Sequence, residues 1–275
     1  MLAVKRLFQV QNALVIPCGR ACPVQSAPAS AFYTINEHAM PDTQAAAPSF
    51  LPFFLAASLA LAGGFADAAS FVLLGVFSGH LTGNSILSGI SIVEGSFTQL
   101  WAILTAVGGF VSGTVSGVLW RRRIGTARGM ALPLGLEIIV VGVGVLAYEN
   151  LDASLRDYGL ALCLSLALGL QNGVYATVGT SKVHTTYITG VTTSLLNTLF
   201  YGPEQSAAKR HDRGMFATVL CSFVLGGAAG AFLTYHHGVL GVLGLMAPLL
   251  MSMPLCCRFF SHPKPGLASN RTAAH

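Results

Sequence analysis

The chain has 275 residues, of which 53% are hydrophobic and only 9% are charged, with a net charge of +5. Soluble domains usually carry about one quarter charged residues, so the composition excludes an ordinary soluble protein and predicts an integral membrane protein. An excess of Lys and Arg is typical of loops that flank spans, so we interpret the net charge as a topology signal and expect no nucleic-acid partner.

Residues 1–49 form an N-terminal leader that lacks the apolar pattern of a core helix. The leader has no acidic residue before Glu37 and contains three basic ones. It can be interpreted as a basic targeting segment or as sequence upstream of a natural start at Met40. We favour the start at Met40, because residues 40–50 form a short polar approach to a first span, and we expect the leader to be disordered or to precede the natural protein.

The remainder of the chain is predicted to be all-α. Six apolar stretches reach or approach the roughly 20 residues that a spanning helix needs. They are residues 51–76, 101–120, 131–148, 155–178, 215–235 and 239–256. The sequence therefore predicts a polytopic membrane domain over residues 50–257 with six transmembrane helices, followed by a cytoplasmic tail at 258–275.

The basic residues predict the orientation of these spans. If the spans alternate in direction, all Lys and Arg residues except Arg156 lie on the side of the N-terminus, and the opposite side also carries Glu94, Glu149, Asp152 and Asp157. Basic residues close to spans resist translocation, so we expect both termini in the cytoplasm. The expected location is a cell membrane, either a bacterial inner membrane or a plasma membrane.

The sequence contains an internal repeat. The stretch "GFADAASFVLLGVFSGHLTGN" at 64–84 aligns with "GLQNGVYATVGTSKVHTTYITGV" at 169–191, and "FVSGTVSG" at 110–117 aligns with "FVLGGAAG" at 223–230. Repeat one covers residues 50–148 and repeat two residues 155–257, each with three predicted spans. Because three is odd, the second repeat enters the membrane from the opposite side, so the repeats are predicted to be inverted.

Spaced glycines predict close helix packing. Gly109, Gly113 and Gly117 follow one another at four-residue steps on one face of the second span, and Gly226 and Gly230 are the counterparts of the last two. Small residues at this spacing let two helix backbones approach closely. The partner helix can belong to the same chain or to a second copy, so the pattern is compatible with a homo-oligomer.

Two short helices are predicted to begin at Thr82 and Thr189, whose hydroxyls can cap them. The helix from residue 82 to about 93 is roughly 16 Å long and the helix from 189 to about 201 roughly 18 Å, about half of a bilayer core. If both spanned fully, the Arg121–Arg123 cluster would lie outside. We therefore predict re-entrant half-helices whose N-termini meet near the membrane centre and attract an anionic or carbonyl-bearing ligand. Interfacial helices are the alternative.

Candidate substrate- or ion-binding residues surround these predicted half-helices. They are Asp67, Thr82, Gly83, Asn84, Glu137, Gln171, Asn172, Thr186, Thr189 and Gly190. Asp67 lies roughly 24 Å along the first span, where an ionised carboxylate is costly, so it either carries a proton or cation or bonds to backbone or to Ser70. Asn172 is its uncharged counterpart. Glu137 has only Met246 as a counterpart and is either a second proton site or a packing group.

The sequence gives little support for a metal site, a lipid modification or an enzyme. His80 and His184 flank the two half-helices and either respond to pH or are satisfied polar groups. The remaining histidines and the six cysteines lack metal-ligand spacing, so we expect no metal and no cofactor. The pair Cys256–Cys257 fits apolar filling better than palmitoylation. No hydrolase, nucleotide-binding or metalloprotease motif occurs, and we expect no enzyme activity.

The two long repeated stretches resemble the signature stretches of the YoaK-like family of bacterial and fungal membrane proteins of unknown function. The resemblance covers roughly residues 50–257 and implies a six-helix membrane protein, with no assigned substrate or mechanism. It places the candidate residues listed above at signature positions, with Glu137 matching an acid common in the third span. Lys182 departs from the pattern, because it adds a charge to the second approach loop.

These features predict a small-solute secondary transporter with a site near the membrane midplane. A ligand would lie between the two half-helix ends, and Asp67 would carry a proton or cation as the two halves rock. The partners are then the lipid bilayer and an unknown small solute, moved with or without a proton. A non-transporting scaffold or regulatory protein, assembled through the Gly109–Gly117 face, is the alternative.

Overall fold

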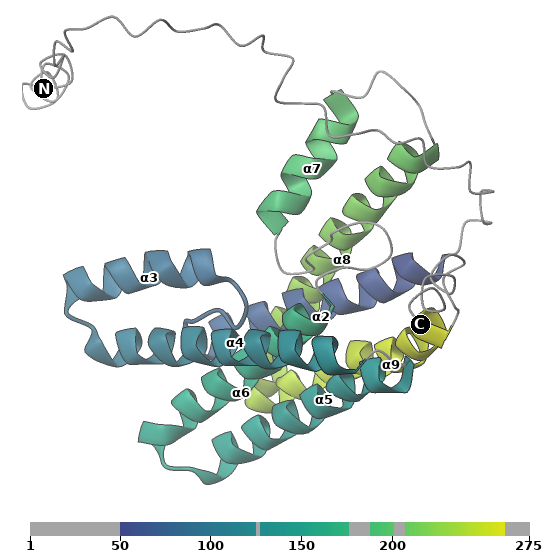
Figure 1. Cartoon of the computed structure of the whole chain (residues 1–275). Helices are drawn as coiled ribbons and strands as arrows, with labels where there is room; N and C mark the ends of the chain where they lie inside the picture. Colours follow the sequence, from purple (N-terminus) through teal and green to yellow (C-terminus); the bar gives the residue numbers. More distant parts are fainter. Residues whose placement is uncertain (1–49, 125–126, 176–187, 201–206, 262–275) are drawn as a thin grey trace, which may run out of the picture. The chain divides into compact units, whose positions relative to one another are not determined.

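A computed structural model describes residues 50–124, 127–175, 188–200 and 207–261. All of them belong to one compact unit that comprises residues 49–275. Within these described ranges the chain is helical throughout and forms no strand (Figure 1). The helices are α2 (Leu51–Leu74), α3 (Leu81–Glu94), α4 (Phe97–Arg123), α5 (Ala127–Asn150), α6 (Ala153–Val174), α7 (Ile188–Phe200), α8 (Ala207–His237), the 3₁₀ segment η1 (Gly238–Leu245) and α9 (Met246–Ser261).

Four stretches of the described chain are long and apolar enough to cross a membrane. They are Leu51–Leu74, Phe97–Arg123, Gly129–Asn150 and Arg210–Phe260. The last stretch contains 51 residues and is not one straight helix, because Gly238 adopts a positive φ of 58° and η1 separates α8 from α9. The structure thus has the all-helical, polytopic character expected of a membrane protein, and α2 begins at the predicted residue, Leu51.

The most extensive contacts join α2 to α8 and α4 to α6. Glycines make these crossings close: a Cβ on Gly64 of α2 would overlap the carbonyl oxygen of Phe223, and a Cβ on Gly113 of α4 would overlap that of Leu166. Gly226 and Gly230 face α2, while Gly109, Gly113 and Gly117 face α6. The face formed by Gly109, Gly113 and Gly117 is therefore occupied by a helix of the same chain and is not open to a second copy.

The loop after α2 folds back along this helix, and the short helix α3 then runs in the same direction as α2. Helix α2 ends at Gly75, which has a φ of 67° and whose carbonyl accepts a 2.9 Å hydrogen bond from Nε2 of Gln99 in α4. The chain then reverses, and α3 runs beside the N-terminal part of α4 until Gly95, where a second positive φ of 71° allows the turn into α4 (Figure 1). At 1.5 Å per residue, α3 is about 21 Å long and α4 about 40 Å, so α3 begins about halfway along α4.

The predicted helix caps are wrong in detail. α3 begins at Leu81 after His80, so Thr82 lies inside the first turn and is exposed. α7 begins at Ile188, which places Thr189 at its second helical residue. The start of α3 is set instead by side-chain contacts of the preceding loop, described below.

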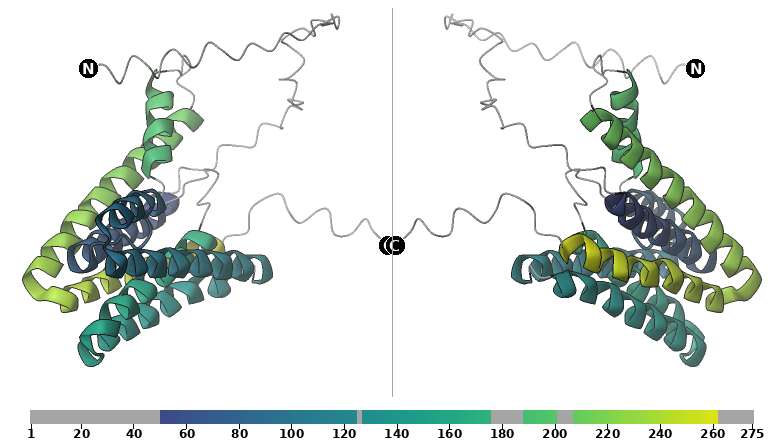
Figure 2. Two further views of the ribbon diagram at one scale, coloured as in Figure 1. Left: turned by 90° about the vertical axis from the view of Figure 1, so that its left-hand side faces the viewer. Right: turned by 90° about the vertical axis from the view of Figure 1, so that its right-hand side faces the viewer.

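The second short helix, α7, packs beside the N-terminal part of α8 (Figures 1 and 2). Nη2 of Arg213 in α8 donates a 3.0 Å hydrogen bond to the carbonyl oxygen of Thr198 in α7. Because each short helix packs on the long helix that follows it, α3 and α7 do not form an extensive packing pair. The meeting of their N-termini near the membrane centre stays a prediction.

Candidate functional site

The carboxylate of Asp67 is the centre of the strongest candidate site. Asp67 lies on α2, is 4% exposed and accepts a 2.6 Å hydrogen bond at Oδ1 from the backbone N–H of Gly79. Oδ2 makes no other hydrogen bond with the described residues, and its closest ionisable neighbour is His80, whose Nδ1 lies 3.4 Å away. One carboxylate oxygen of Asp67 is thus hydrogen-bonded to the backbone, and the other can accept a proton or a hydrogen bond from a donor group.

His80 connects this buried carboxylate to the protein surface. It lies in the loop between α2 and α3, outside the spanning helices, and its side chain is 35% exposed. The Asp67 carboxylate, as hydrogen-bond acceptor and as a negative charge, raises the pKa of His80, while partial burial of the ring opposes that rise. The ring centroids of Phe77 and Phe223 lie 5.8 and 6.4 Å from that of His80.

Asn84 holds the same loop in place. Its Oδ1 accepts a 2.9 Å hydrogen bond from the N–H of Phe77, and its Nδ2 donates a 2.7 Å hydrogen bond to the carbonyl oxygen of Phe77. Ser78 adds a 3.3 Å hydrogen bond from Oγ to the carbonyl oxygen of Ala66. Asn84 is itself only 1% exposed. These contacts give Asn84 a structural role in folding residues 76–80 back along α2.

Two glycines provide the room that this loop needs. A Cβ on Gly79 would overlap the side chain of Leu168 in α6, and a Cβ on Gly83 would overlap the ring of Phe77. The loop therefore contacts α6 as well as α2, because Gly79 packs directly against Leu168. Gly83, predicted as a ligand-binding residue, is explained by this packing.

The candidate residues of the second repeat are dispersed. Gln171, fully buried on α6, donates a 3.0 Å hydrogen bond from Nε2 to the carbonyl oxygen of Leu59 on α2. Asn172 follows it and is partly buried. Thr189 and Gly190 lie in the first turn of α7. Thr186 and His184 lie outside the described residues. Among the described candidates, Asp67 and Asn84 both bond to the loop between α2 and α3.

Glu137 belongs to a second buried cluster. It lies on α5, is 2% exposed, and its Oε1 has no hydrogen-bond partner among the described residues. Tyr175 at the end of α6 is a neighbour of Glu137, and its hydroxyl donates a short hydrogen bond to the carbonyl oxygen of Met130. Cys256 of α9 is fully buried, and its Sγ lies 3.7 Å from the same hydroxyl. Cys256 is thus a packing residue that a palmitoylating enzyme cannot reach in this fold.

Sequence reasoning assigned Cys256 to apolar filling, which its burial supports, but missed Tyr175 and the contact between the two residues. Tyr175 stands three residues after Asn172 in the repeated stretch, and this proximity is the one signal that could have identified it. Cys256 lies 81 residues further along the chain, and only the packing of α9 brings it to Tyr175.

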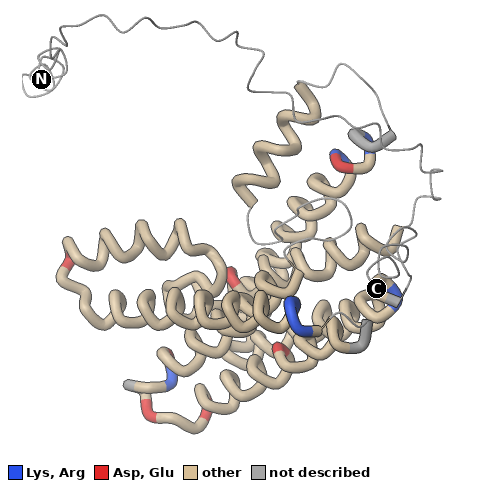
Figure 3. Tube along the Cα trace, in the orientation of Figure 1, with Lys and Arg blue, Asp and Glu red and all other residues tan. Residues whose placement is uncertain are grey.

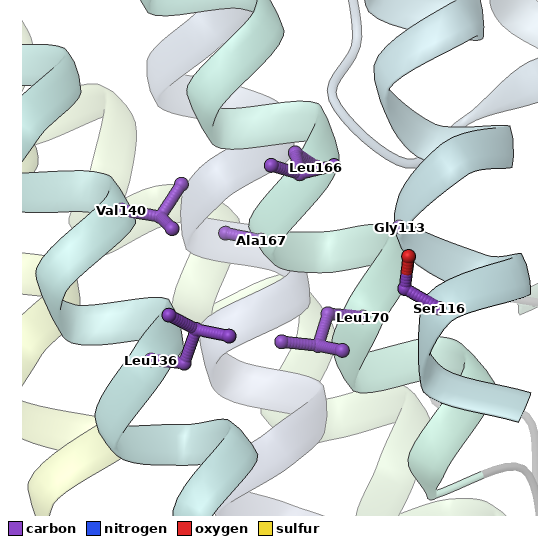
Figure 4. Close-up of a pocket in the computed structure, with 7 residues that line it drawn as sticks. All are labelled: Gly113, Ser116, Leu136, Val140, Leu166, Ala167 and Leu170. Carbon is purple, nitrogen blue, oxygen red and sulfur yellow. The ribbon is translucent and has the colours of Figure 1, made fainter. Parts of the chain in front are cut away.

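A pocket of about 110 Å³ opens between α4, α5 and α6. Figure 4 shows the side chains that line it: Gly113, Ser116, Leu136, Val140, Leu166, Ala167 and Leu170. The hydroxyl of Ser116 is the single polar side-chain group of this lining, and Ser116 and Leu136 are exposed. Such a lining suits an acyl chain better than a polar solute, so the pocket does not compete with Asp67 as a solute site.

The comparisons with known proteins agree with the membrane character of the chain. Residues 55–255 match the model of a family described as "Protein of unknown function (DUF1275)". The UPF0700 transmembrane protein YoaK of Bacillus subtilis (strain 168) is 28% identical over 146 residues, which cover 50% of this chain and 63% of that protein. No solved structure matches. The family match covers most of the chain and the spanning helices, so this integral membrane protein belongs to the YoaK-like DUF1275 family.

Proposed function

We propose that this protein is a small-solute secondary transporter whose site lies inside the membrane beside Asp67. The observation that carries the proposal is a buried carboxylate on a spanning helix, held by the backbone of a loop that folds back toward the middle of that helix. Carboxylates in spanning helices are costly and usually serve an ion or substrate pathway. Irregular backbone at such depth is tolerated only against protein or a wet cavity.

The proposal includes six spans, with both termini in the cytoplasm of a cell membrane. Besides the four stretches named above, α6 has 22 residues, and α8 and α9 are separate helices. Figure 3 shows basic residues at the C-terminal end of α4, the N-terminal end of α8 and the C-terminal end of α9, with Asp212 beside those of α8. Acidic residues mark the turns between α3 and α4 and between α5 and α6, with Arg156 beside the second turn. Under the positive-inside rule this charge distribution favours the proposed orientation.

The glycine contacts support two inverted repeats. The alignment equates Gly64 with Gly169 and Phe110 with Phe223, and the structure contains both Gly64 against Phe223 and Gly169 against Phe110. Exchanging the repeats therefore converts one of these contacts into the other. An internal twofold axis requires this relation, and a bundle of unrelated halves does not.

Further glycine contacts follow the same rule. Gly226 meets the carbonyl oxygen of Leu61 in the α2–α8 crossing, and Gly113 meets that of Leu166 in the α4–α6 crossing. Gly230 with Phe65 and Gly117 with Leu170 form the next equivalent pair. With three spans in each repeat, the axis would lie in the membrane plane, as in many secondary transporters.

The packing also favours particular moving bodies. Because α2 joins α8 and α4 joins α6 through backbone contacts at glycines, each of these pairs should move as a unit. Each pair contains one helix from each repeat, so the relative motion would occur between the pairs and not between the sequence halves. The loop at Gly79, bonded to Asp67 of α2 and packed on Leu168 of α6, lies where the two pairs meet.

Flux measurements in proteoliposomes test the proposal. Purified protein is reconstituted and screened for uptake of amino acids, sugars, organic acids and inorganic anions under an imposed pH gradient. Asp67→Asn should reduce the flux of the accepted solute at least tenfold. Asp157→Asn, a matched change at an exposed carboxylate on α6, should leave it unchanged. Absence of flux for every solute class would favour the scaffold alternative.

A further inference from the structure

The site contains two titratable side chains that face each other from different elements. Nδ1 of His80 in the loop lies 3.4 Å from Oδ2 of Asp67 on α2. Other elements that meet this site present apolar groups: Leu168 from α6, Phe223 from α8 and Phe77 from the loop. Asn84 of α3 is occupied with Phe77. Among the described residues, Asp67 is therefore the one charged group that acts on His80.

We propose that Asp67 and His80 together bind one proton, and that this proton is the coupling ion of the transporter. The coupling role rests on the proposed function; the proton site does not. With the proton bound, the imidazolium of His80 donates from Nδ1 to Oδ2 of Asp67 and the pair is neutral. When the proton leaves His80 for water, a single buried negative charge remains on Asp67, held by the N–H of Gly79.

The geometry favours a proton over a metal cation. Oδ1 of Asp67 is occupied by the N–H of Gly79, so one carboxylate oxygen and one ring nitrogen remain. Hard cations such as Ca²⁺ and Mg²⁺ take about six or more oxygen ligands. No group of three His, Cys, Asp or Glu residues that could hold a metal occurs in the part of the chain that the structure describes. Two facing groups of this kind suffice for a proton.

The position of the pair suggests a route for the proton and a way in which loss of the proton changes the attachment of the loop to α2. The side chain of His80 is 35% exposed and that of Asp67 only 6%, so the proposal assigns the entry and exit of the proton to His80. His80 directly follows Gly79, whose N–H bonds to the other oxygen of Asp67. Loss of the proton thus weakens one of two adjacent attachments of the loop to α2, while Gly79 still packs on α6.

The second repeat cannot duplicate this site. The alignment equates Asp67 with Asn172, and an amide carries no negative charge to stabilise an imidazolium. We therefore expect no equivalent proton-binding pair in the second repeat.

Solid-state NMR of ¹⁵N-histidine-labelled protein in lipid bilayers tests the proton site without any transport assay. The imidazole signal of His80 is assigned from its loss in His80→Gln, and each sample is titrated from about pH 5 to pH 9. His80 should titrate above the ordinary value of 6.5. Asp67→Asn should lower its midpoint enough to weaken proton affinity at least tenfold, while Asp157→Asn leaves it unchanged.

A conservative variant shows whether a lowered midpoint results from loss of the charge or from loss of the fold. Asp67→Glu keeps the carboxylate and should retain a raised midpoint, and helix content by circular dichroism is compared for all variants. An unchanged His80 midpoint in folded Asp67→Asn overturns the proton site. If the midpoint behaves as expected and flux is independent of the pH gradient, the coupling role is overturned. If no solute moves at all, the proposed function is overturned and the proton site stands.

Discussion

The backbone N–H of Gly79 donates a 2.6 Å hydrogen bond to Oδ1 of Asp67, twelve residues earlier in the chain. Asp67 precedes Gly75, the end of α2, by eight residues, so Gly79 has returned about 12 Å toward the middle of the helix. This bond, with the Asn84 contacts to Phe77, determines where α3 begins.

Two substitutions of Asp67 distinguish the effect of its charge from its effect as the hydrogen-bond acceptor of Gly79. Asp67→Asn keeps an oxygen that can accept from Gly79, whereas Asp67→Leu leaves that N–H without its partner. We expect Asp67→Leu to be less stable than Asp67→Asn by about 1–3 kcal/mol, the cost of an unsatisfied buried group. Unfolding in mixed detergent micelles measures both variants. Equal stability would show that the Gly79 bond contributes little.

Asn84→Ala should release the loop. The change removes both hydrogen bonds to Phe77, at a cost of about 1–3 kcal/mol. Amide hydrogen exchange at residues 76–80 should rise, with little change in α5 or α9. Thr82→Ala is the matched control, because Thr82 is exposed in the same helical turn. Equal exchange in both variants would contradict the structural role of Asn84.

Alanine substitutions at two glycines of α4 should differ sharply in their effect on stability. Gly113→Ala places a methyl group against the carbonyl oxygen of Leu166, so we expect destabilisation of about 1–3 kcal/mol or loss of folded protein. Gly108→Ala meets open space and should be neutral or slightly stabilising because alanine favours the helix. Thermal unfolding in detergent compares the two. A similar loss in both would contradict the α4–α6 crossing.

The repeat relation extends this prediction. Gly64→Ala and Gly169→Ala each place a methyl group against the carbonyl oxygen of the equivalent phenylalanine, Phe223 or Phe110. Both variants should therefore lose stability to a similar extent. A large loss in only one of them would weaken the case for two inverted repeats.

The pair of His80 and Asp67 predicts a pH dependence of stability. Because the pKa of His80 is raised in the folded protein above its ordinary value of 6.5, the contribution of the pair is fully present below pH 6.5. It is lost as pH rises through the higher, folded-state pKa. The melting temperature should therefore fall over this window in the parent and less in His80→Gln. Equal falls would remove the pair as the cause.

Cysteine labelling tests the orientation. In a cysteine-free background, Glu94→Cys and Asp152→Cys should react with an impermeant thiol reagent from outside the cell, and Arg122→Cys only after permeabilisation. Glu94 and Asp152 are exposed, and Arg122 lies in the last turn of α4. Labelling of all three positions from one side would rule out the alternating six-span arrangement.

Local properties of the chain predicted the helices and the types of contact they make. The apolar stretches predicted helices because burial in lipid depends on composition, and α2 begins at Leu51 as expected. The four-residue spacing of Gly109, Gly113 and Gly117 indicated close packing, because that spacing places them on one helix face. A buried acid at Asp67 followed from its place within an apolar run.

The partners of these groups depended on the tertiary structure. The spacing of the glycines does not specify which helix lies against them, and the fold places α6 there. The Thr82 hydroxyl satisfied the local rule for a helix cap, but Asn84 and Phe77 set the start of α3. Tyr175 reaches Cys256 across 81 residues. Composition and periodicity act along a few turns of chain, whereas the Asp67–His80 pair exists only because the loop folds back along α2.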